Sequence, residues 1–329
     1  MQRRMPVYFA PMEGLTDAVF RRVHHEMFTG VAAYMIPFIS PTQNLVLNGR
    51  EKHNVLPEHN RGIPCIPQVL TKEAEHFLWA TETLAGMGYT EVNLNAGCPS
   101  GTVTAKGKGA GILKDPDRLD AFLEKICKRS PLPISVKTRI GFETPEEWER
   151  LLEVYCRYPI SSLIVHPRTC RERYDPDQLH RDLLEETVRR FPEKVIVNGD
   201  LFTLNDIREI SHRYGTDSVM LGRGLVANPA LARVLAGGEP LQKEEIIRFH
   251  DRLEEEMSKE YNPDIVFMKL RVVVKHLACC FDETGKLERK IRKSRNLREL
   301  LETDRTLFEQ CELKKDPCFV PDERRNGEV

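Results

Sequence analysis

The stretch that decides the fold is Glu91–Leu113, which reads EVNLNAGCPSGTVTAKGKGAGIL. It begins as a short strand in which apolar and asparagine side chains alternate. A loop with one cysteine, Cys98, follows, and then a run of glycines with Lys106 and Lys108 between them. Glycines at this density allow a loop to move and a ligand to approach the backbone. A thiol before a mobile basic loop is typical of a catalytic acid facing an anionic substrate, although a buried structural cysteine is commoner.

The composition describes an ordinary globular protein of 329 residues, with 40% hydrophobic and 30% charged residues. The net charge of −1 excludes a uniformly basic nucleic-acid coat but leaves room for a local basic face. The nine cysteines form no CxxC pair and no zinc-ligand spacing, and the start lacks a signal-peptide pattern. We therefore expect a reduced, cytoplasmic protein without a metal site, a membrane span or an obligate protein partner.

A repeated unit fills the first two thirds of the chain: a short apolar run, a polar turn and a helical stretch. The runs predict eight strands, at Val7–Met12, Ala32–Phe38, Pro64–Leu70, Glu91–Gly97, Ile134–Ile140, Ser162–Arg168, Val195–Leu201 and Ser218–Gly224. Amphipathic patterns predict helices at Lys72–Met87, Pro116–Arg129, Pro145–Tyr158, Leu179–Phe191 and Leu204–Tyr214. The stretch Ser40–Gly62 predicts a long loop with at most a short helix.

Strand–helix alternation predicts parallel strands with right-handed crossovers. Eight such units predict an α/β fold, the (β/α)8 or TIM barrel. The alternative is an open doubly wound sheet, but its G-x-G-x-x-G fingerprint is absent after the first strand.

The chain beyond Leu241 predicts a small all-α helical bundle. We expect a barrel domain over residues 1–238, a helical domain over 239–318 and a flexible tail over 319–329. The run Lys286–Arg298 holds seven Lys or Arg and one Glu. Charge runs are usually solvated helix faces, but one this one-sided in a nearly neutral protein favours RNA contact.

The predicted strand ends carry polar and charged side chains, and barrel enzymes place their active sites at these ends. Three neighbouring strands end in i, i+2 pairs: Lys137 with Arg139, His166 with Arg168, and Asn198 with Asp200. Each pair projects from one face of its strand. Charge on a buried strand is costly unless it is compensated, so a set of such ends predicts a ligand site.

Two glycine-containing turns suggest the ligand of this site. Asn198-Gly199-Asp200 and Gly222-Arg223-Gly224 follow strands seven and eight, where barrels commonly bind phosphate. The Gln68 amide can pair with the edge of a heterocycle, and Lys137 can hold negative charge near a ring. A phosphate with a flat heterocycle suggests FMN, and a sugar phosphate stays open on this argument.

The motifs APMEGLTD, NLNAGCPS, VKTRIGFE, VHPRT, VNGD and VMLGRG occur in this order between Ala10 and Gly224. This set resembles the tRNA-dihydrouridine synthase family. The resemblance implies an FMN-bearing TIM barrel followed by a helical RNA-binding domain. It also implies that NADPH supplies electrons to reduce the uridine C5–C6 bond in tRNA.

The resemblance assigns roles to individual residues. Cys98 would be the acid that protonates C5, because an ordinary thiol is mostly protonated at pH 7. FMN would be bound by Pro11, Met12, Glu13, Gln68, Lys137, His166, Asn198, Gly199, Asp200, Gly222 and Arg223. The substrate RNA would be bound by Asn95, Arg139, Arg168, Lys106, Lys108, Arg289, Lys290, Arg292 and Lys293, with His166 also flanking the uracil ring.

Two departures from the family pattern leave the subfamily and the target uridine open: Pro167 between the histidine and arginine, and Gly101-Thr102 ahead of the lysines. The alternatives within flavin enzymes are a barrel acting on a free pyrimidine, similar to dihydroorotate dehydrogenase, and a synthase acting on ribosomal RNA. More distant alternatives are a flavin-free aldolase with Lys137 as Schiff base and a non-catalytic RNA-binding barrel, which has no use for Cys98.

Overall fold

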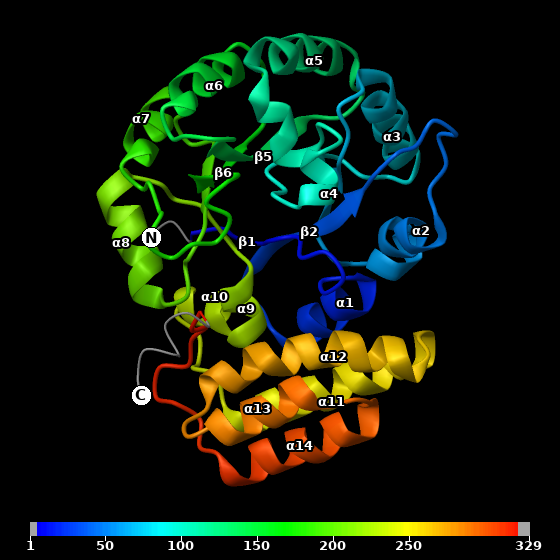
Figure 1. Ribbon diagram of the computed structural model, residues 1–329, viewed down its shortest axis with the longest axis vertical. Coiled ribbons are helices and arrows are strands. Elements are labelled where there is room, and N and C mark those ends of the chain that lie inside the picture. Colours follow the sequence, from blue (N-terminus) through cyan, green and yellow to red (C-terminus); the bar gives the residue numbers. More distant parts are fainter. Residues whose placement is uncertain (1–4, 322–329) are drawn as a thin grey trace. The chain divides into compact units, whose positions relative to one another are not determined.

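The computed structural model describes residues 5–321, and within them eight strands form a closed barrel in sequence order (Figure 1). The strands are β1 (Val7–Phe9), β2 (Val31–Ile39), β3 (Cys65–Val69), β4 (Val92–Ala96), β5 (Ile134–Gly141), β6 (Leu163–Thr169), β7 (Val195–Asn198) and β8 (Val219–Leu221). Helices lie between the parallel strands, so the predicted TIM barrel is confirmed. The closed strand order excludes the open doubly wound sheet.

The helices that connect the strands were partly predicted. They are α1 (Ala18–Met27), α2 (Gly49–Val55), α3 (Ala74–Gly86), α4 (Gly101–Thr104), α5 (Pro116–Arg129), α6 (Glu147–Cys156), α7 (Leu183–Arg190), α8 (Leu204–Tyr214), α9 (Arg223–Ala227) and α10 (Leu231–Leu235). The bounds of α5 and α8 match the prediction, whereas α1, α4, α9 and α10 were not predicted. The predicted loop at 40–62 contains α2, whose start is fixed by a capping box between Asn48 and Glu51, and the 3-10 helix η1 (Pro57–Asn60).

Several strands end earlier than predicted, for local reasons. The strand expected at Val7–Met12 stops at Phe9, because the Met12 carbonyl accepts hydrogen bonds from the amides of Leu15 and Thr16 and starts a turn. The strand expected to reach Leu201 stops at Asn198, since Gly199 and Asp200 have positive φ values of 115° and 47°. The candidate site residues Met12 and Asp200 therefore lie in loops and not in strands.

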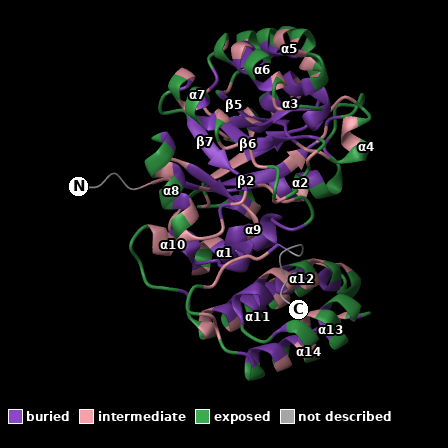
Figure 2. Cartoon of the chain, turned by 60° about the vertical axis from the view of Figure 1, so that its left-hand side comes forward, coloured by how far each residue is buried: buried purple, intermediate pink, exposed green. Residues whose placement is uncertain are grey.

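Residues 5–321 divide into two compact units. One unit holds Ala33–Asp200 and Glu209–Met220; the other holds the residues up to Ala32, Leu201–Arg208 and the residues from Leu221 onward. In both units the strands are buried and exposed residues lie on the outer sides of the helices (Figure 2). A domain boundary between residues 238 and 239 stays a prediction.

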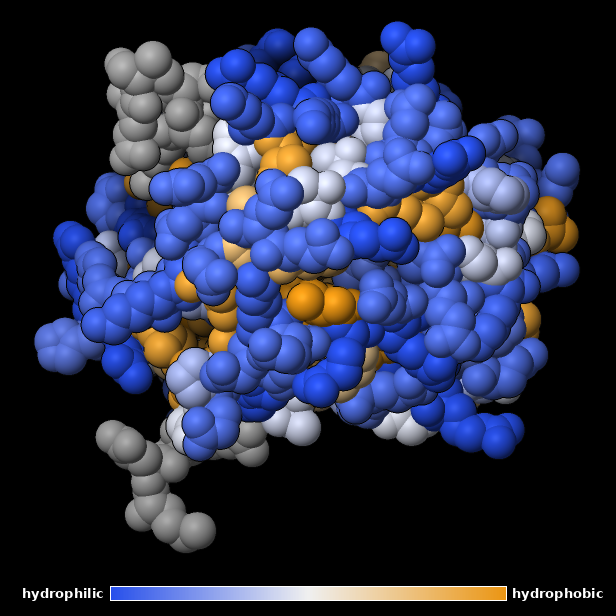
Figure 3. All heavy atoms as spheres, turned by 90° about the horizontal axis from the view of Figure 1, so that it is seen from below, coloured by the Kyte–Doolittle hydropathy of each residue, from blue (hydrophilic) through white to orange (hydrophobic). Residues whose placement is uncertain are grey.

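The C-terminal part of the chain is helical, as predicted. It contains α11 (Lys243–Glu260), α12 (Pro263–Leu277), the 3-10 helix η3 (Ala278–Cys280), α13 (Gly285–Lys293) and α14 (Leu297–Gln310). Helix α12 packs against α11, α13 and α14, and the apolar side chains between them are buried. The surface drawn in Figure 3 is mostly hydrophilic, with hydrophobic atoms in small separate patches. Small separate patches are normal for a soluble surface.

The predicted tail has only its first residues in the described part of the chain. Phe319 is half-buried there and its ring contacts those of Phe202 and His276. Residues 322–329 of the expected flexible tail lie outside the described residues.

Candidate active site

The loop that carries Cys98 is held from the end of β4. The side-chain oxygen of Asn95 accepts hydrogen bonds from the amides of Gly97, at 3.1 Å, and Cys98, at 2.9 Å. This turn is a local side-chain cap of the kind that asparagine favours. Cys98 itself is half-buried. The sequence therefore presents the thiol on a short, fixed turn directly after the strand.

The other side of the Cys98 loop is held by the segment after it. Gly109 has φ of 57°, and a Cβ atom there would lie 2.8 Å from the Cys98 carbonyl oxygen. The Ala110 amide donates to the same oxygen at 3.0 Å. The segment that we expected to be a mobile basic loop instead forms α4 and the 3-10 helix η2 (Gly109–Lys114). A glycine is required here because the backbone of η2 packs directly on Cys98.

Three amide side chains connect β3, β4 and β5. The Gln68 side chain donates to Asn93 at 2.8 Å and accepts from Asn95 at 2.7 Å, and Asn93 donates to Ser135 Oγ at 3.0 Å. Gln68 and Asn93 are paired in the strand register and are fully buried. The two groups of Gln68 that we expected to face a heterocycle thus each bind a neighbouring amide.

Lys137 follows from the register of the next strand. Residue 137 on β5 is the register partner of Asn95 on β4, and its side chain is half-buried. Burial lowers the pKa of Lys137 to about 8, and the nearby Arg139 adds to the decrease while Cys98 opposes it. Lys137 is therefore a partly buried lysine whose amine interacts with the Cys98 thiol, and it is cationic below about pH 8.

Arg139 is buried and supports the cysteine loop. Its Nε donates to the Gly97 carbonyl at 3.0 Å, and one terminal nitrogen donates to the Thr169 carbonyl at 2.8 Å. The ring of Tyr174, which is 52% exposed, lies 5.2 Å from the guanidinium carbon. Burial lowers the pKa of Arg139. Two of its donors bind backbone carbonyls, and its expected contact with the substrate stays a prediction.

Arg168 is fully buried, and its donors also bind within the protein. It donates to the Asp175 carbonyl at 2.7 Å, to His166 Nε2 at 3.0 Å and to the Asp200 carboxylate at 2.5 Å. Because Nε2 accepts this bond, the imidazole is neutral and carries its proton on Nδ1. Gly199 must be glycine, since a Cβ atom there would lie 3.0 Å from the His166 ring. This cluster orients His166 and Asp200 together.

The remaining cofactor candidates follow β1, end β7 or follow β8. Pro11 and Met12 are half-buried and Glu13 is exposed, and the Met12 amide donates to Thr16 Oγ1 at 2.9 Å. Asn198 donates to the Met220 carbonyl at 2.8 Å. Arg223 is the first residue of α9, and a Cβ atom at Gly222 before it would make a tight contact of 3.3 Å with the Cβ atom of Ala10.

A cluster of lysines lies near the Cys98 loop. Lys106 is exposed, whereas Lys108 is half-buried and donates to Ser40 Oγ at 3.0 Å. Burial lowers the pKa of Lys108, and repulsion from Lys106 and Lys72 lowers it further. Sequence reasoning missed Lys72. Its position directly after the strand end at Leu70-Thr71 was the signal that could have found it.

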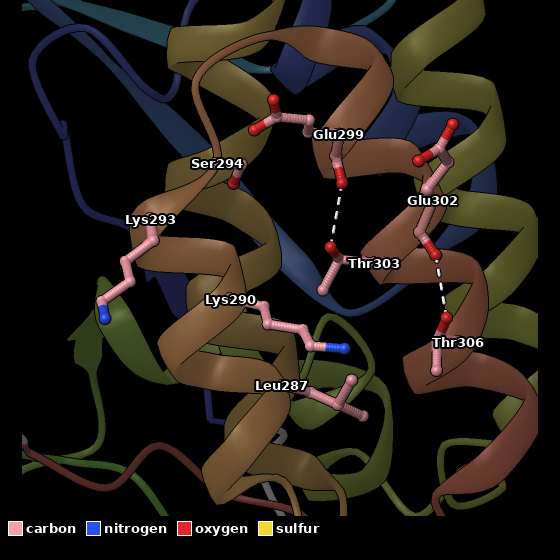
Figure 4. Close-up of a pocket in the computed structure, with 8 residues that line it drawn as sticks. All are labelled: Leu287, Lys290, Lys293, Ser294, Glu299, Glu302, Thr303 and Thr306. Carbon is pink, nitrogen blue, oxygen red and sulfur yellow. Dashed lines mark hydrogen bonds between the residues drawn. The ribbon is translucent and has the colours of Figure 1, made fainter.

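The predicted RNA-binding residues of the helical part all reach solvent. Arg289, Lys290, Arg292 and Lys293 are exposed on α13. A groove of about 380 Å³ lies between α13 and α14, and Figure 4 shows Lys290 extending from α13 toward Thr303 on α14. The α14 wall carries Glu299 and Glu302. The run at 286–298 is therefore not one helix, because it is interrupted after Lys293 and resumes in α14.

The structure groups the expected residues by unit. One unit holds Gln68, Asn95, Cys98, Lys106, Lys108, Lys137, Arg139, His166, Arg168, Asn198, Gly199 and Asp200; the other holds Pro11, Met12, Glu13, Gly222, Arg223, Arg289, Lys290, Arg292 and Lys293.

Within residues 5–321 no group of three or more His, Cys, Asp or Glu side chains is arranged to hold a metal ion. None of the helices in that range is long and apolar enough to cross a membrane.

A closed parallel barrel with a thiol, a buried lysine and glycine turns at its strand ends defines a TIM-barrel enzyme. A family model described as dihydrouridine synthase (Dus) matches residues 8–318. The chain belongs to the dihydrouridine synthase family, whose members are oxidoreductases.

Named relatives agree with the family assignment. The chain is 32% identical to the "tRNA-dihydrouridine(16) synthase" of Aquipseudomonas alcaligenes, over 72% of this chain and 78% of that protein. It is 30% identical to the "Probable tRNA-dihydrouridine synthase 2" of Bacillus subtilis, over 79% and 83%. It is 31% identical to a "Probable tRNA-dihydrouridine synthase" of Staphylococcus aureus, over 67% and 68%.

Proposed function

We propose that this protein is a cytoplasmic tRNA-dihydrouridine synthase that uses FMN and NADPH to reduce the C5–C6 double bond of a uridine in tRNA. The observation that carries the proposal is the fixed position of Cys98 beside Lys137 and Asn95. A half-buried thiol held by Asn95 and by the backbone of η2 is suited to deliver a proton to one defined atom. Family membership and the relatives named for tRNA support the substrate.

The residues fit a flavin. Gly199 directly follows β7 and Gly222 directly follows β8, and glycine turns after these two strands are where barrels commonly bind phosphate. Arg223 is positioned at the start of α9 to meet a phosphate, and Lys137 is cationic at neutral pH. The Gln68 side-chain oxygen accepts one hydrogen bond, from Asn95, and with its second lone pair it would accept a bond from the isoalloxazine edge.

Bound FMN, once reduced by NADPH, would supply the hydride that C6 of uracil receives. The protein's part is to hold the uracil ring and to provide the proton for C5. Cys98 would donate that proton from its thiol and be reprotonated from solvent, so that NADPH, a proton and uridine give NADP⁺ and dihydrouridine. Lys137 would stabilise negative charge that develops on the uracil oxygens. His166 is neutral with its proton on Nδ1, so it would orient the ring rather than compete as an acid.

The lysine cluster would bind the RNA strand that enters the site. Lys72, Lys106 and Lys108 repel one another, and the lowered pKa of Lys108 reflects this repulsion together with burial. A phosphate would relieve the repulsion, so the cluster is suited to phosphates next to the target uridine. Arg139 and Arg168, whose donors bind backbone, His166 and Asp200, would position the loops and not the RNA.

The experiment that tests the function compares substrates and cofactors. We expect the purified protein to be yellow, to be bleached by NADPH and to be reoxidised by tRNA but not by free uracil or orotate. A colourless protein would contradict the use of FMN, and turnover of a free pyrimidine would favour the dihydroorotate dehydrogenase-like alternative. Sequencing of dihydrouridine in a deletion strain would give the target position and would distinguish tRNA from ribosomal RNA.

A further inference from the structure

Helix α12 extends one lysine side chain to the turn that follows β1. Lys269 Nζ donates to the Gly14 carbonyl at 2.9 Å and forms an ion pair with the Asp17 carboxylate at 2.7 Å. The hydroxyl of Tyr261, the C-cap of α11, donates to the same carboxylate at 3.0 Å. All four residues belong to one compact unit. The C-terminal helices therefore hold this turn directly.

The ion pair is largely shielded from solvent. The side chains of Lys269 and Asp17 are 16% and 7% exposed. Asp17 is also the N-cap of α1, because its Oδ1 accepts from the Phe20 amide at 3.0 Å while its Oδ2 binds Lys269 and Tyr261. Salt screens a buried pair little, and separation of the pair would leave a buried charge without its partner. The link from α12 to the start of α1 is therefore firm.

The middle of the turn depends on this link. Bonds of Met12 close the turn: its carbonyl accepts from the amides of Leu15 and Thr16 at 3.0 Å, and its amide donates to Thr16 Oγ1 at 2.9 Å. Between them Gly14 has φ of 78°, and a Cβ atom there would meet nothing within 4 Å. A glycine in open space can change its backbone angles at little cost. The bond from Lys269 to the Gly14 carbonyl limits this freedom.

The same turn carries candidate residues of the cofactor site. Met12 is half-buried and Glu13 is exposed, and the proposed function places both against FMN. A Cβ atom at Gly222 would lie 3.6 Å from the Met12 sulfur, so the turn adjoins the candidate residue that follows β8. Gly222 belongs to the same compact unit as the turn. A shift of the turn would therefore move one wall of the proposed cofactor site.

We infer that Lys269 is a positioning residue for the flavin: from the helical part, it holds the turn after β1 in the arrangement that FMN meets. The inference rests on the proposed function, in which Met12 and Glu13 line the cofactor. It goes beyond that function because it makes the affinity for FMN depend on a helix of the part that was assigned to RNA. A turn that is already ordered loses less freedom when its ligand binds, so the link contributes to affinity.

The test compares two ion pairs that connect the start of the chain to the C-terminal helices. Lys269→Met removes the amine and keeps the apolar stem. Arg22→Met is the matched control, because Arg22 on α1 pairs with Glu256 and Glu260 on α11 instead of the turn. Full-length protein freed of flavin is titrated with FMN, and quenching of flavin fluorescence gives the Kd. We expect Lys269→Met to weaken FMN binding about 5- to 30-fold, the cost of ordering the backbone of one residue, and Arg22→Met to bind like the wild type.

Hydrogen–deuterium exchange of the flavin-free proteins locates the effect. In Lys269→Met, peptides that cover residues 12–16 should exchange faster than in the wild type, whereas peptides that cover α14 should exchange at the same rate. Arg22→Met should leave the exchange of residues 12–16 unchanged. Lys269→Gln can still donate to the Gly14 carbonyl but carries no charge, so it should lie between Lys269→Met and the wild type. It tests the same link if the methionine variant does not fold.

The outcomes separate positioning from general stability. Wild-type FMN affinity in Lys269→Met would overturn the inference, and so would an equal loss of affinity in Arg22→Met, which would mean that the turn has no special part. Faster exchange in α14 as well as in the turn would mean general damage to the fold and would also overturn it. A wild-type protein that does not bind FMN would instead overturn the proposed use of FMN, and this inference with it.

Discussion

The backbone of Gly109 lies directly against Cys98: a Cβ atom at residue 109 would be 2.8 Å from the Cys98 carbonyl oxygen and 2.9 Å from the Cys98 Cβ. The hydrogen bond from Ala110 to the same carbonyl fixes this contact. The position of the thiol therefore depends on a residue that lies outside its own turn. A side chain at 109 would force the loop and the thiol apart.

We predict that Gly109→Ala lowers dihydrouridine synthesis by at least about tenfold, because displacement of a catalytic group by about 1 Å costs this much or more. The positive φ of Gly109 adds strain to the clash. Gly101→Ala is the matched control, since Gly101 is in the same segment and a Cβ atom there would meet nothing within 4 Å. The rate at which dihydrouridine forms in tRNA, with the enzyme in excess over tRNA, measures the effect. Equal rates for the two variants would contradict the contact's role.

Cys98→Ala should separate the two half-reactions. The thiol is assigned to proton delivery and not to FMN, so the variant should retain flavin and be reduced by NADPH at the wild-type rate. Reoxidation of the reduced flavin by tRNA should be slower by about a hundredfold to ten-thousandfold, the usual contribution of a positioned acid. Stopped-flow absorbance of the flavin follows both steps.

Cys156→Ala is the control for this experiment, because Cys156 is exposed on α6 and has no assigned role. Reoxidation of the Cys98→Ala protein by tRNA at the wild-type rate would mean that Cys98 is a structural residue. Loss of flavin from that variant would mean that its loop contributes to the cofactor site.

Replacing Arg289, Lys290, Arg292 and Lys293 by glutamine should weaken tRNA binding and reduce its salt dependence. Each lost phosphate contact should change the slope of log Kd against log salt by up to about one. FMN content should stay the same. Affinity for tRNA, measured at several salt concentrations, gives the slope, and an unchanged slope would mean that α13 is only a solvated face.

The groove between α13 and α14 allows the opposite experiment, in which a negative charge is removed and tRNA binding is expected to become stronger. Glu302→Gln removes a negative charge from the wall that faces Lys290, so it should strengthen tRNA binding. Lys259→Gln is the control for the arginine and lysine substitutions on α13. It also removes a positive charge, but Lys259 is exposed on α11 and already paired with Glu255 and Glu256. It should leave the salt slope close to that of the wild type.

A buried histidine should make the stability of the helical part depend on pH. His250 on α11 bonds to Asp304 on α14 at 3.2 Å and to Asp251 at 2.9 Å. Burial lowers the pKa of His250, but the bonds to Asp251 and Asp304 outweigh it and raise the pKa from 6.5 to about 9. The protonated histidine thus stabilises the fold fully below about pH 6.5, and this contribution is lost as the pH rises through 9.

We predict that His250→Gln, which can still donate to Asp304 but cannot titrate, lowers Tm most below pH 6.5. The difference from wild type should shrink steadily between pH 6.5 and 9. A pKa change of one unit corresponds to about 1.4 kcal/mol, so the effect should be on the order of 1–3 kcal/mol once the cost of burying Asp304 is included. Thermal unfolding followed from pH 6 to pH 10 measures it. A Tm difference that is constant over this range would contradict the prediction.

The sequence predicted the barrel because strand runs and helical periodicity are local properties. It also predicted that Cys98 follows a strand end, since the glycine break is visible in the chain. It could not predict that Arg139 and Arg168 are buried, because their partners depend on the whole fold: the carbonyls of Gly97 and Asp175 lie in loops, and that of Thr169 lies at the end of the neighbouring strand β6. Phe319 was missed for the same reason, as its contact with Arg223 joins distant parts of the chain.

The bonds among Gln68, Asn93 and Asn95 give these side chains a single shared orientation. If the Gln68 amide turned over, its nitrogen would face the nitrogen of Asn95 and its oxygen would face the oxygen of Asn93, so both bonds would be lost unless the neighbours turned as well. A turn of Asn95 would in turn remove the acceptor that holds the Cys98 amide. The three amides are therefore fixed together in one orientation, and any change that rotated Gln68 would also disturb the turn that carries the proton donor.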